Sequence, residues 1–224
     1  MTVNIDNLII TTPAPKSETN PVALEVTGAV ALATLSEFVA RLPDGSIRLN
    51  APTKGAASKS THRTRCEWKE PVYWGLGSAA THRNHQTFTL QKVNSLQKVV
   101  ISQLHVKDDD SPPIKVFWNK GKLTYGFRSE FNQATAPTTT FLTEVPLGAP
   151  FEIIIEVSSS GVVILSATCN GRTGRSPALQ LASTWNARNF NFHGGVYNQI
   201  DFTDSTPAAD GSVCVISRLE LTHF

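Results

Sequence analysis

The amino-acid sequence predicts an all-β protein, a sandwich or jelly roll of two antiparallel sheets, and three observations lead to this prediction. Short segments in which β-branched or aromatic residues alternate with polar residues dominate the chain. Turn signals recur about every ten residues, as they do where short strands are joined by tight loops. Strands do not alternate with helical segments, so the sequence does not predict a parallel α/β sheet.

The expected elements can be placed in chain order. We expect strands at residues 46–52, 64–70, 86–93, 98–106, 114–118, 123–129, 151–157, 162–169, 191–199 and 214–224. Residues 119–122 (NKGK) predict a hairpin turn with Gly121 at a position of positive φ, and residues 158–161 predict another. Only residues 35–42 (LSEFVARL) and 181–185 have helical spacing, and both segments are short.

Length and charge restrict the class of protein. No repeat or linker divides the 224 residues, so we expect one domain over residues 1–224. The 20 basic and 18 acidic residues give a formal charge of +2, without the dense basic stripe of a nucleic-acid-binding protein. A local cationic groove for an anionic sugar polymer remains compatible with this balance. No apolar run reaches the roughly 20 residues of a membrane span, and the first residues lack the pattern of a signal peptide.

The cysteines and one acidic run leave alternatives open. Cys66, Cys169 and Cys214 do not have the spacing of metal ligands. A disulfide between Cys169 and Cys214 is one interpretation, and three buried thiols are the other. The run Asp108–Asp110 is interpreted as a solvated loop, with a calcium site as the alternative.

Three expected strands carry polar faces of unusual composition, because residues i, i+2 and i+4 of a strand share a face. Strand by strand, these faces hold Arg65, Glu67 and Lys69; Gln103 and His105; and Asn191, His193, Gly195, Tyr197 and Gln199. The opposite faces, expected to point to the core, hold Cys66 and Trp68; Val100, Leu104 and Val106; and Phe192 and Val196. An ordinary solvent face is the alternative, but it usually carries Thr, Ser, Lys and Glu. Arg, Gln, His and Tyr instead favour a shared, ligand-binding sheet.

The same three segments resemble segments of the family 7 polysaccharide lyases, the alginate lyases. Residues 65–70 (RCEWKE) resemble the family's R-(S/T)-E-L-R-E segment, residues 103–105 (QLH) its Q-(I/V)-H segment, and residues 192–199 (FHGGVYNQ) its Y-F-K-A-G-V-Y-N-Q segment. They occur in the family's order, and residues 219–223 resemble its last strand. The resemblance implies a β-jelly roll with a concave substrate cleft. It also implies a secreted or periplasmic enzyme, expected to be a monomer, that cleaves 1,4-linked uronate polymers, alginate in the first place.

The resemblance also implies the site. Arg65, Gln103, His105 and Tyr197 are expected to be catalytic; the residues expected to bind substrate are Glu67, Lys69, His193, Asn198 and Gln199. In β-elimination, Arg65 and Gln103 would offset the charge of the uronate carboxylate. His105 would remove the C5 proton and Tyr197 would protonate the leaving oxygen, or Tyr197 would do both in a syn elimination. This scheme uses no metal or cofactor, so His82 and His85 are interpreted as surface residues of a polar loop.

Departures from the family pattern leave the preferred polymer open. Lys69 stands where Arg is usual, which keeps the charge but loses bidentate geometry. His193 stands where Lys is common, so a fixed positive charge becomes dependent on pH. Leu104 is neither the Ile nor the Val that loosely tracks preference for guluronate or mannuronate.

Three other functions compete with an alginate lyase. A lyase for another polyuronate, such as glucuronan, would use the same site. A non-catalytic carbohydrate-binding jelly roll would favour exposed aromatic platforms, whereas Trp68 and Trp118 fall on apolar faces. A glycoside hydrolase needs two carboxylates beside the bond, and no convincing pair stands out.

Overall fold

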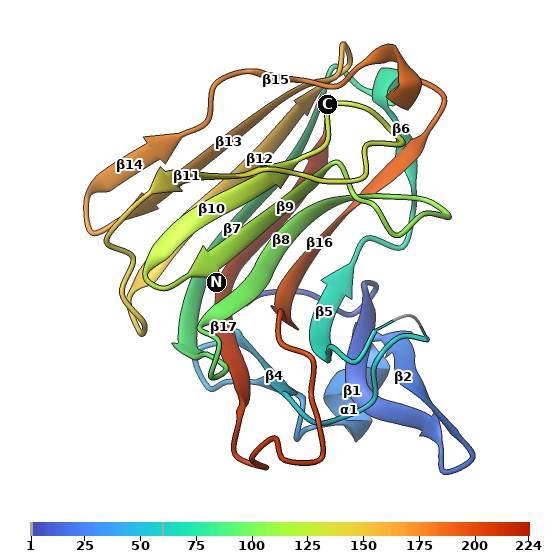
Figure 1. Cartoon of the computed structure of the whole chain (residues 1–224), viewed down its shortest axis with the longest axis vertical. Helices are drawn as coiled ribbons and strands as arrows, with labels where there is room; N and C mark the ends of the chain where they lie inside the picture. The colour runs from blue at the N-terminus through green and yellow to red at the C-terminus, as the bar shows by residue number, and fades with distance from the viewer. Residues whose placement is uncertain (1, 60) are drawn as a thin grey trace.

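The computed structural model describes residues 2–59 and 61–224, in which two antiparallel sheets are stacked face to face (Figure 1). The first sheet runs in the order β11 (Thr138–Leu142), β10 (Lys122–Phe127), β9 (Ile114–Asn119), β8 (Lys98–Val106), β16 (Asn189–Asn198), β5 (Arg65–Lys69), β1 (Ile9–Ser17) and β2 (Asn20–Thr27), with β6 (Trp74–Gly75) paired to β16. The second runs in the order β14 (Arg172–Arg175), β13 (Val162–Cys169), β12 (Pro150–Ser158), β7 (Thr81–Lys92), β17 (Gly211–His223), β4 (Ile47–Pro52) and β3 (Val39–Arg41), with β15 (Leu179–Gln180) paired to β13. The predicted sandwich of antiparallel sheets is confirmed.

The core lies between the two sheets and follows directly from strand alternation. In β12 and β13 every second side chain is buried, so that Ile153, Ile155 and Leu165 point inward. Trp68 and Trp118 belong to the same core, as predicted. Because the core takes one face of each sheet, the other face of the first sheet is free to form a site.

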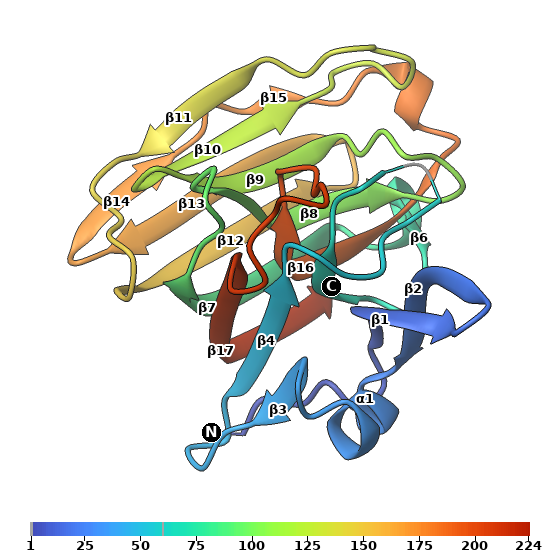
Figure 2. The same ribbon diagram turned by 60° about the horizontal axis from the view of Figure 1, so that its bottom comes forward.

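The β1–β2 hairpin forms one end of the first sheet, beside β5, and Figure 2 shows it at the edge of the molecule. Helix α1 (Gly28–Thr34) follows the hairpin, and two 3-10 turns occupy Leu76–Ser78 and Ser183–Trp185. The sequence did not predict β1 or β2, because prolines and polar residues interrupt their alternation. Among the described residues no helix has the length and apolarity to cross a bilayer.

The helical spacing of residues 35–42 does not correspond to a helix in the structure. The helix ends earlier, and Val39 to Arg41 form an edge strand that pairs with β4, with Val39 opposite Leu49. Thr27 caps α1, since its hydroxyl accepts a hydrogen bond from the Val30 amide at 3.4 Å. The helical spacing near residues 181–185 corresponds to a single 3-10 turn.

Strand β7 begins at Thr81 rather than at residue 86, so the placement of His82 and His85 in a surface loop is wrong. Both side chains are buried, because β7 lies in the middle of the second sheet between β12 and β17. His82 Nδ1 lies 2.7 Å from His223 Nδ1, and its Nε2 donates to the Leu76 carbonyl at 3.1 Å. The ring of His82 therefore has a partner at each nitrogen inside the fold.

A β-bulge changes the faces of β8. The pairing with β9 and with β16 shifts by one residue around Ile101. Val100, predicted to point to the core, consequently lies on the outer face, in an apolar cluster with Phe117 and Tyr197. That prediction is wrong, because alternation cannot reveal an inserted residue.

The structure also shows the predicted hairpin turn and the state of the three cysteines. Lys120 and Gly121 both have positive φ, 49° and 76°, in a two-residue turn between the paired residues Asn119 and Lys122, so the predicted hairpin is confirmed. All three cysteines are free and buried, which corresponds to the second interpretation and not to a disulfide between Cys169 and Cys214.

Candidate active site

A cavity of about 520 Å³ opens on the outer face of the first sheet, against the β1–β2 hairpin. All four residues predicted to be catalytic line it, together with two predicted to bind substrate; these are Arg65, Gln103, His105, Tyr197, Lys69 and His193. Strand register explains this convergence, because residues directly opposite each other share a face. His193 lies opposite Lys69 on β5 and Gln103 on β8.

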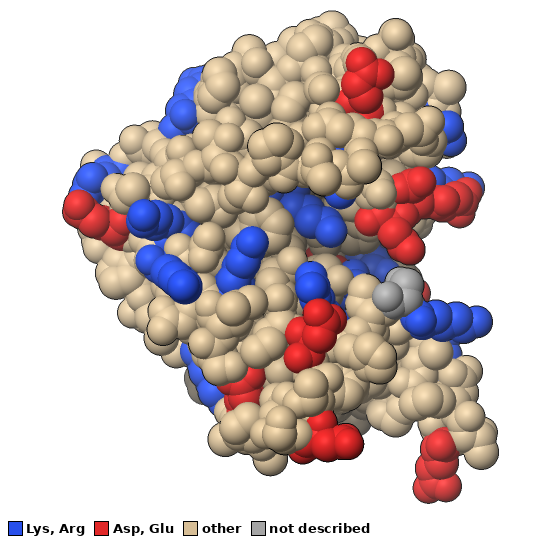
Figure 3. Space-filling view, in the orientation of Figure 1, with Lys and Arg blue, Asp and Glu red and all other residues tan. Residues whose placement is uncertain are grey.

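The cavity is strongly basic although the chain is almost neutral. Two carboxylates, Glu25 and Asp110, face six cations: Lys16, Lys59, Arg63, Arg65, Lys69 and Lys115. In Figure 3 lysine and arginine side chains gather across the middle of this face, around a hollow. Such a concentration of one charge raises the local concentration of an anionic ligand.

Glu67 organises the floor of the cavity from beneath. Its side chain is 1% exposed, accepts a hydrogen bond from Gln103 Nε2 at 2.5 Å and lies 3.4 Å from Arg65 Nη1. The Arg65 guanidinium also stacks on the ring of Tyr197, with 3.7 Å between its central carbon and the ring centroid. Glu67, predicted to bind substrate, does not line the cavity and instead orients two residues that do.

His105 is held as a neutral imidazole with one nitrogen available. Its Nδ1 lies 2.9 Å from the carbonyl of Val106, which can only accept, so Nδ1 carries the hydrogen and Nε2 keeps its lone pair. Burial lowers the pKa of His105 to about 4, and the cations of Lys69 and Arg65 act in the same direction. His105 is therefore able to accept a proton at neutral pH.

His193 lies behind His105 and not at the surface. The two rings are stacked, 4.4 Å apart and inclined by 10°, and His193 is 3% exposed. Its Nε2 donates to Asn191 Oδ1 at 2.9 Å, while Asn191 Nδ2 donates to the Glu70 carbonyl. Burial holds the pKa of His193 well below its usual value, and His105 adds to this effect. His193 therefore carries no positive charge at neutral pH.

Of the remaining predicted residues, Lys69 and Gln199 are near the substrate side of the sheet. The ammonium of Lys69 forms an ion pair with Glu25 of β2, so part of its charge is already neutralised. Gln199 donates to the carbonyls of Tyr197 and Asn198 at 3.3 and 3.2 Å and lines a neighbouring cavity.

Asn198, predicted to bind substrate, is fully buried and does not reach the cavity. Its amide makes four hydrogen bonds of 2.7 to 3.0 Å, with the Ala51 carbonyl, Thr64 Oγ1, Asn94 Nδ2 and Ser212 Oγ. A saturated, buried amide has no free donor or acceptor for a ligand. The assignment of a substrate contact to Asn198 is therefore corrected to a structural role.

Sequence reasoning missed several residues of the cavity. Lys16 and Lys59 come from a hairpin and a loop that the sequence did not predict, and Arg63 precedes β5. Lys115 lies opposite Gln103 on the neighbouring strand. It can be assigned to the cavity only when the pairing of β8 with β9 is known. Tyr73, 39% exposed, forms part of the rim.

The acidic run Asp108–Asp110 lines a shallow hollow beside Tyr73. Within residues 2–59 and 61–224, no group of three or more His, Cys, Asp or Glu residues has an arrangement that could hold a metal ion.

The sequence profile described as alginate lyase matches residues 3–223. The chain belongs to the alginate lyase family. This confirms the relationship predicted from the three segments. No protein with a curated description matches the chain in sequence.

Solved structures of alginate lyases share this fold. Alginate lyase PA1167 from Pseudomonas aeruginosa superposes with a TM-score of 0.83 at 23% identity, over 99% of this chain and 100% of that one. Alginate lyase A1-II′, a member of polysaccharide lyase family 7, gives 0.78 at 19% identity, over 98% and 95%. The alginate lyase from Klebsiella pneumoniae gives 0.79 at 16% identity, over 100% and 97%.

Proposed function

We propose that this protein cleaves the 1,4-glycosidic bonds of alginate by β-elimination and releases 4,5-unsaturated oligosaccharides. One observation carries the proposal: Arg65, Gln103, His105 and Tyr197 converge in a single basic cavity of an alginate lyase family member. Uronate polymers are anionic, so the excess of cations in the cavity matches the charge of the substrate.

Arg65 and Gln103 are proposed to offset the charge of the substrate carboxylate. Removal of the C5 proton beside an ionised carboxylate builds up negative charge, which preorganised donors must stabilise. Glu67 engages one nitrogen of Arg65 and the amide of Gln103, and both side chains retain further N–H groups. Their orientation is thus fixed before substrate arrives.

His105 and Tyr197 are proposed as the base and the acid. His105 Nε2 has a free lone pair on the cavity side and is neutral at pH 7. Tyr197 carries a hydroxyl on the same face, and its ring is fixed between Arg65 and the cluster of Val100 and Phe117. In an anti elimination His105 takes the proton and Tyr197 protonates the leaving oxygen; in a syn elimination Tyr197 does both.

A substrate panel tests the proposal. Polymannuronate, polyguluronate, mixed alginate and glucuronan are incubated with the protein, and the ultraviolet absorbance of the new C4–C5 double bond is followed alongside reducing ends. We expect both signals from at least one alginate polymer. Reducing ends without the double bond would identify a hydrolase, binding without either signal a carbohydrate-binding module, and double bonds from glucuronan alone a different polyuronate lyase.

A further inference from the structure

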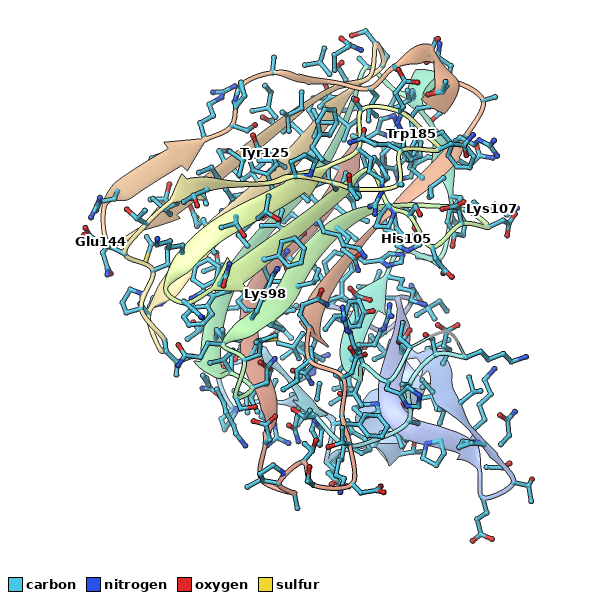
Figure 4. The ribbon with its side chains drawn as sticks, in the orientation of Figure 1. Lys98, His105, Lys107, Tyr125, Glu144 and Trp185 are labelled. Carbon is cyan, nitrogen blue, oxygen red and sulfur yellow. The ribbon has the colours of Figure 1, made fainter. Side chains whose placement is uncertain are left out.

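His105 lies near the end of β8, where Figure 4 labels it, and two different contacts constrain its ring. At the edge of the ring, Nδ1 donates to the Val106 carbonyl at 2.9 Å. One hydrogen bond still lets an imidazole tilt about that bond, because the outer torsion of a histidine side chain is soft. The second contact is the ring of His193, which covers one face of His105 at 4.4 Å, with the two planes inclined by 10°.

Strand register brings these two rings together. Opposed residues form one row across β5, β16, β8 and β9, namely Lys69, His193, Gln103 and Lys115. His105 lies two residues beyond Gln103 on the same face of β8, directly opposite Asn191 and diagonal to His193. A diagonal pair on neighbouring strands is within reach of ring side chains, so the stack follows from the pairing of β8 with β16.

His193 is itself held from within the fold. Its Nε2 donates to Asn191 Oδ1 at 2.9 Å, and Asn191 Nδ2 donates to the Glu70 carbonyl at 2.9 Å, so a flip of this amide would lose both bonds. The Glu70 carboxylate accepts from the Phe192 amide at 2.8 Å and from Trp74 Nε1 at 2.9 Å. Asn191 is buried and does not line the cavity. The support of the His193 ring is therefore in place before substrate binds.

The stacked face is the part of His193 through which it can act on the reaction. Its Nδ1 has no hydrogen-bond partner among the described residues and lies 3.9 Å from Glu67 Oε2, beyond hydrogen-bond distance. Because Nε2 carries the hydrogen, Nδ1 keeps a lone pair and the ring is neutral. With its side chain 3% exposed, His193 offers substrate little surface, whereas its ring lies flat against His105.

We propose that His193 is a positioning residue, whose ring, held by Asn191, fixes the plane of the His105 ring so that Nε2 of His105 faces the C5 proton of the substrate. This inference rests on the proposed function, in which His105 is the base. A base must lie within about 3 Å of the proton and in line with it, so a small tilt of the ring costs turnover. The stack also excludes water from one face of His105 and thus contributes to the burial that lowers its pKa.

Two reciprocal substitutions test the proposal on a uronate polymer whose cleavage requires His105. His193→Phe keeps a flat ring but cannot donate to Asn191, whereas His193→Gln keeps a donor but has no ring. A stacked pair of rings contributes up to roughly tenfold to an equilibrium. At about pH 8, where His105 is neutral in every variant, we expect kcat of His193→Gln to fall about tenfold with little change in KM. We expect His193→Phe to keep a kcat within about twofold of the wild type, with a lower melting temperature.

The titration of His105 is the second readout, and ¹⁵N NMR of the histidine rings measures it without substrate. We expect the pKa of His105 to rise from about 4 toward its ordinary value in His193→Gln, because a polar amide and water replace the ring, and to stay low in His193→Phe. The acid limb of kcat/KM should move in the same way. The other charged groups around His105 are unchanged in both variants; these are Arg65 and Lys69 of β5, Lys115 of β9 and the loop Asp108–Asp110.

His82→Gln is the matched control. His82 is also buried and stacks on a ring, that of Trp74, at 3.8 Å and 7°, but it does not line the cavity. We expect this variant to lose stability while kcat at pH 8 and the pKa of His105 stay at their wild-type values. Equal losses of kcat in His82→Gln and His193→Gln would assign the effect to general loosening of the fold and overturn the proposal. If His193→Gln does not fold, His193→Ala removes the ring in its place, with the same expected result.

The remaining outcomes separate this inference from the proposed function. If the wild type forms unsaturated products but His193→Gln keeps its kcat and the low pKa of His105, the stack does not position the base and the inference falls alone. A loss in His193→Gln through KM only would make His193 a substrate contact. A kcat of His193→Phe as low as that of His193→Gln would assign the effect to the hydrogen bond with Asn191 and not to the stack. If the wild type forms no unsaturated product from any uronan, the proposed function falls and the inference with it.

Discussion

At the scale of single residues, the proposed site depends on buried groups that fix exposed ones. The Val106 carbonyl selects which nitrogen of His105 is free, and Glu67 aims Arg65 and Gln103. Orientation by a neighbour removes the need to order these side chains when substrate binds. Substitution of a residue that reacts with substrate and substitution of a residue that orients it should therefore affect activity separately.

Tyr197→Phe should remove the proposed acid and little else. The ring packs against Val100 and Phe117 and lies under Arg65, and these contacts do not involve the hydroxyl. We expect turnover to fall about 100-fold or more while the melting temperature stays close to that of the wild type. Double-bond absorbance and thermal unfolding measure the two effects. A wild-type rate on every uronan would remove Tyr197 from the mechanism.

Arg65→Ala should cost more turnover than Lys69→Ala. Arg65 retains N–H groups for the substrate carboxylate, whereas the charge of Lys69 is shared with Glu25. Loss of one preorganised donor typically costs about 100-fold in kcat. Steady-state kinetics of the two folded variants on the same polymer compare them directly. Near-normal turnover of Arg65→Ala would show that another group binds the carboxylate.

The activity should persist at a lower pH than an ordinary histidine base allows. The pKa of His105 is about 4, so its neutral, proton-accepting form still predominates at pH 5. We expect the acid limb of kcat/KM to lie about 2.5 pH units below the usual histidine value of roughly 6.5. The pH profile of kcat/KM measures this limb. His105→Asn should abolish anti elimination. An acid limb near pH 6.5 in the wild type would instead mean that water solvates His105 in the substrate pocket.

At the scale of elements, strand register decides which side chains meet. The row from Lys69 to Lys115 needs β5, β16, β8 and β9 in their observed order and pairing. The bulge at Ile101 then turns Val100 outward, where it supports Tyr197. A strand pattern predicts each face separately, but only the pairing brings the faces together.

Asn198→Ala tests the structural role of that residue. Its amide joins the end of β16 to β4 and β17, so it ties the two sheets together. Removing it leaves buried donors and acceptors without partners, which costs about 1–3 kcal/mol each at most sites. We expect a clearly lower melting temperature, with KM for alginate unchanged at a temperature where the variant is folded. A raised KM without lost stability would return Asn198 to substrate binding.

At the scale of the whole molecule, the fold keeps several histidines neutral. Burial, as the first cause, lowers the pKa of His82, His85, His105 and His193 below the usual value. As pH falls below the unfolded value of 6.5, the unfolded chain therefore binds more protons at these histidines than the folded one, which favours unfolding. The stabilisation is present above the unfolded pKa and is lost as pH falls below it.

The melting temperature should consequently fall as pH is lowered from 7 to 5. His193→Gln should flatten this dependence, because it removes a fully buried group whose protonation the fold resists. Thermal unfolding of both proteins at several pH values checks the slope. An equal slope in the variant would place the acid sensitivity in the other histidines.

The sequence by itself determined the sandwich class, most strands and the residues of the cavity floor. β8 and β13 match their predicted bounds, and the three polar faces converge as predicted. Alternation predicts these features because successive side chains of a strand point in turn to the core and to solvent, which follows from the local geometry of the strand. The family pattern supplied the chemistry that alternation alone could not.

The tertiary structure alone decided which polar residues are buried and which neighbours they have. Glu67 lies on the same strand face as Arg65 and Lys69. Asn198 lies between Tyr197 and Gln199 in the sequence. Both side chains are nevertheless buried within the fold. Lys115, Lys16 and Arg63 reach the cavity from strands and loops far apart in the chain. Cross-strand pairing, a one-residue bulge and sheet packing set these positions, and each depends on contacts between distant segments that no local pattern encodes.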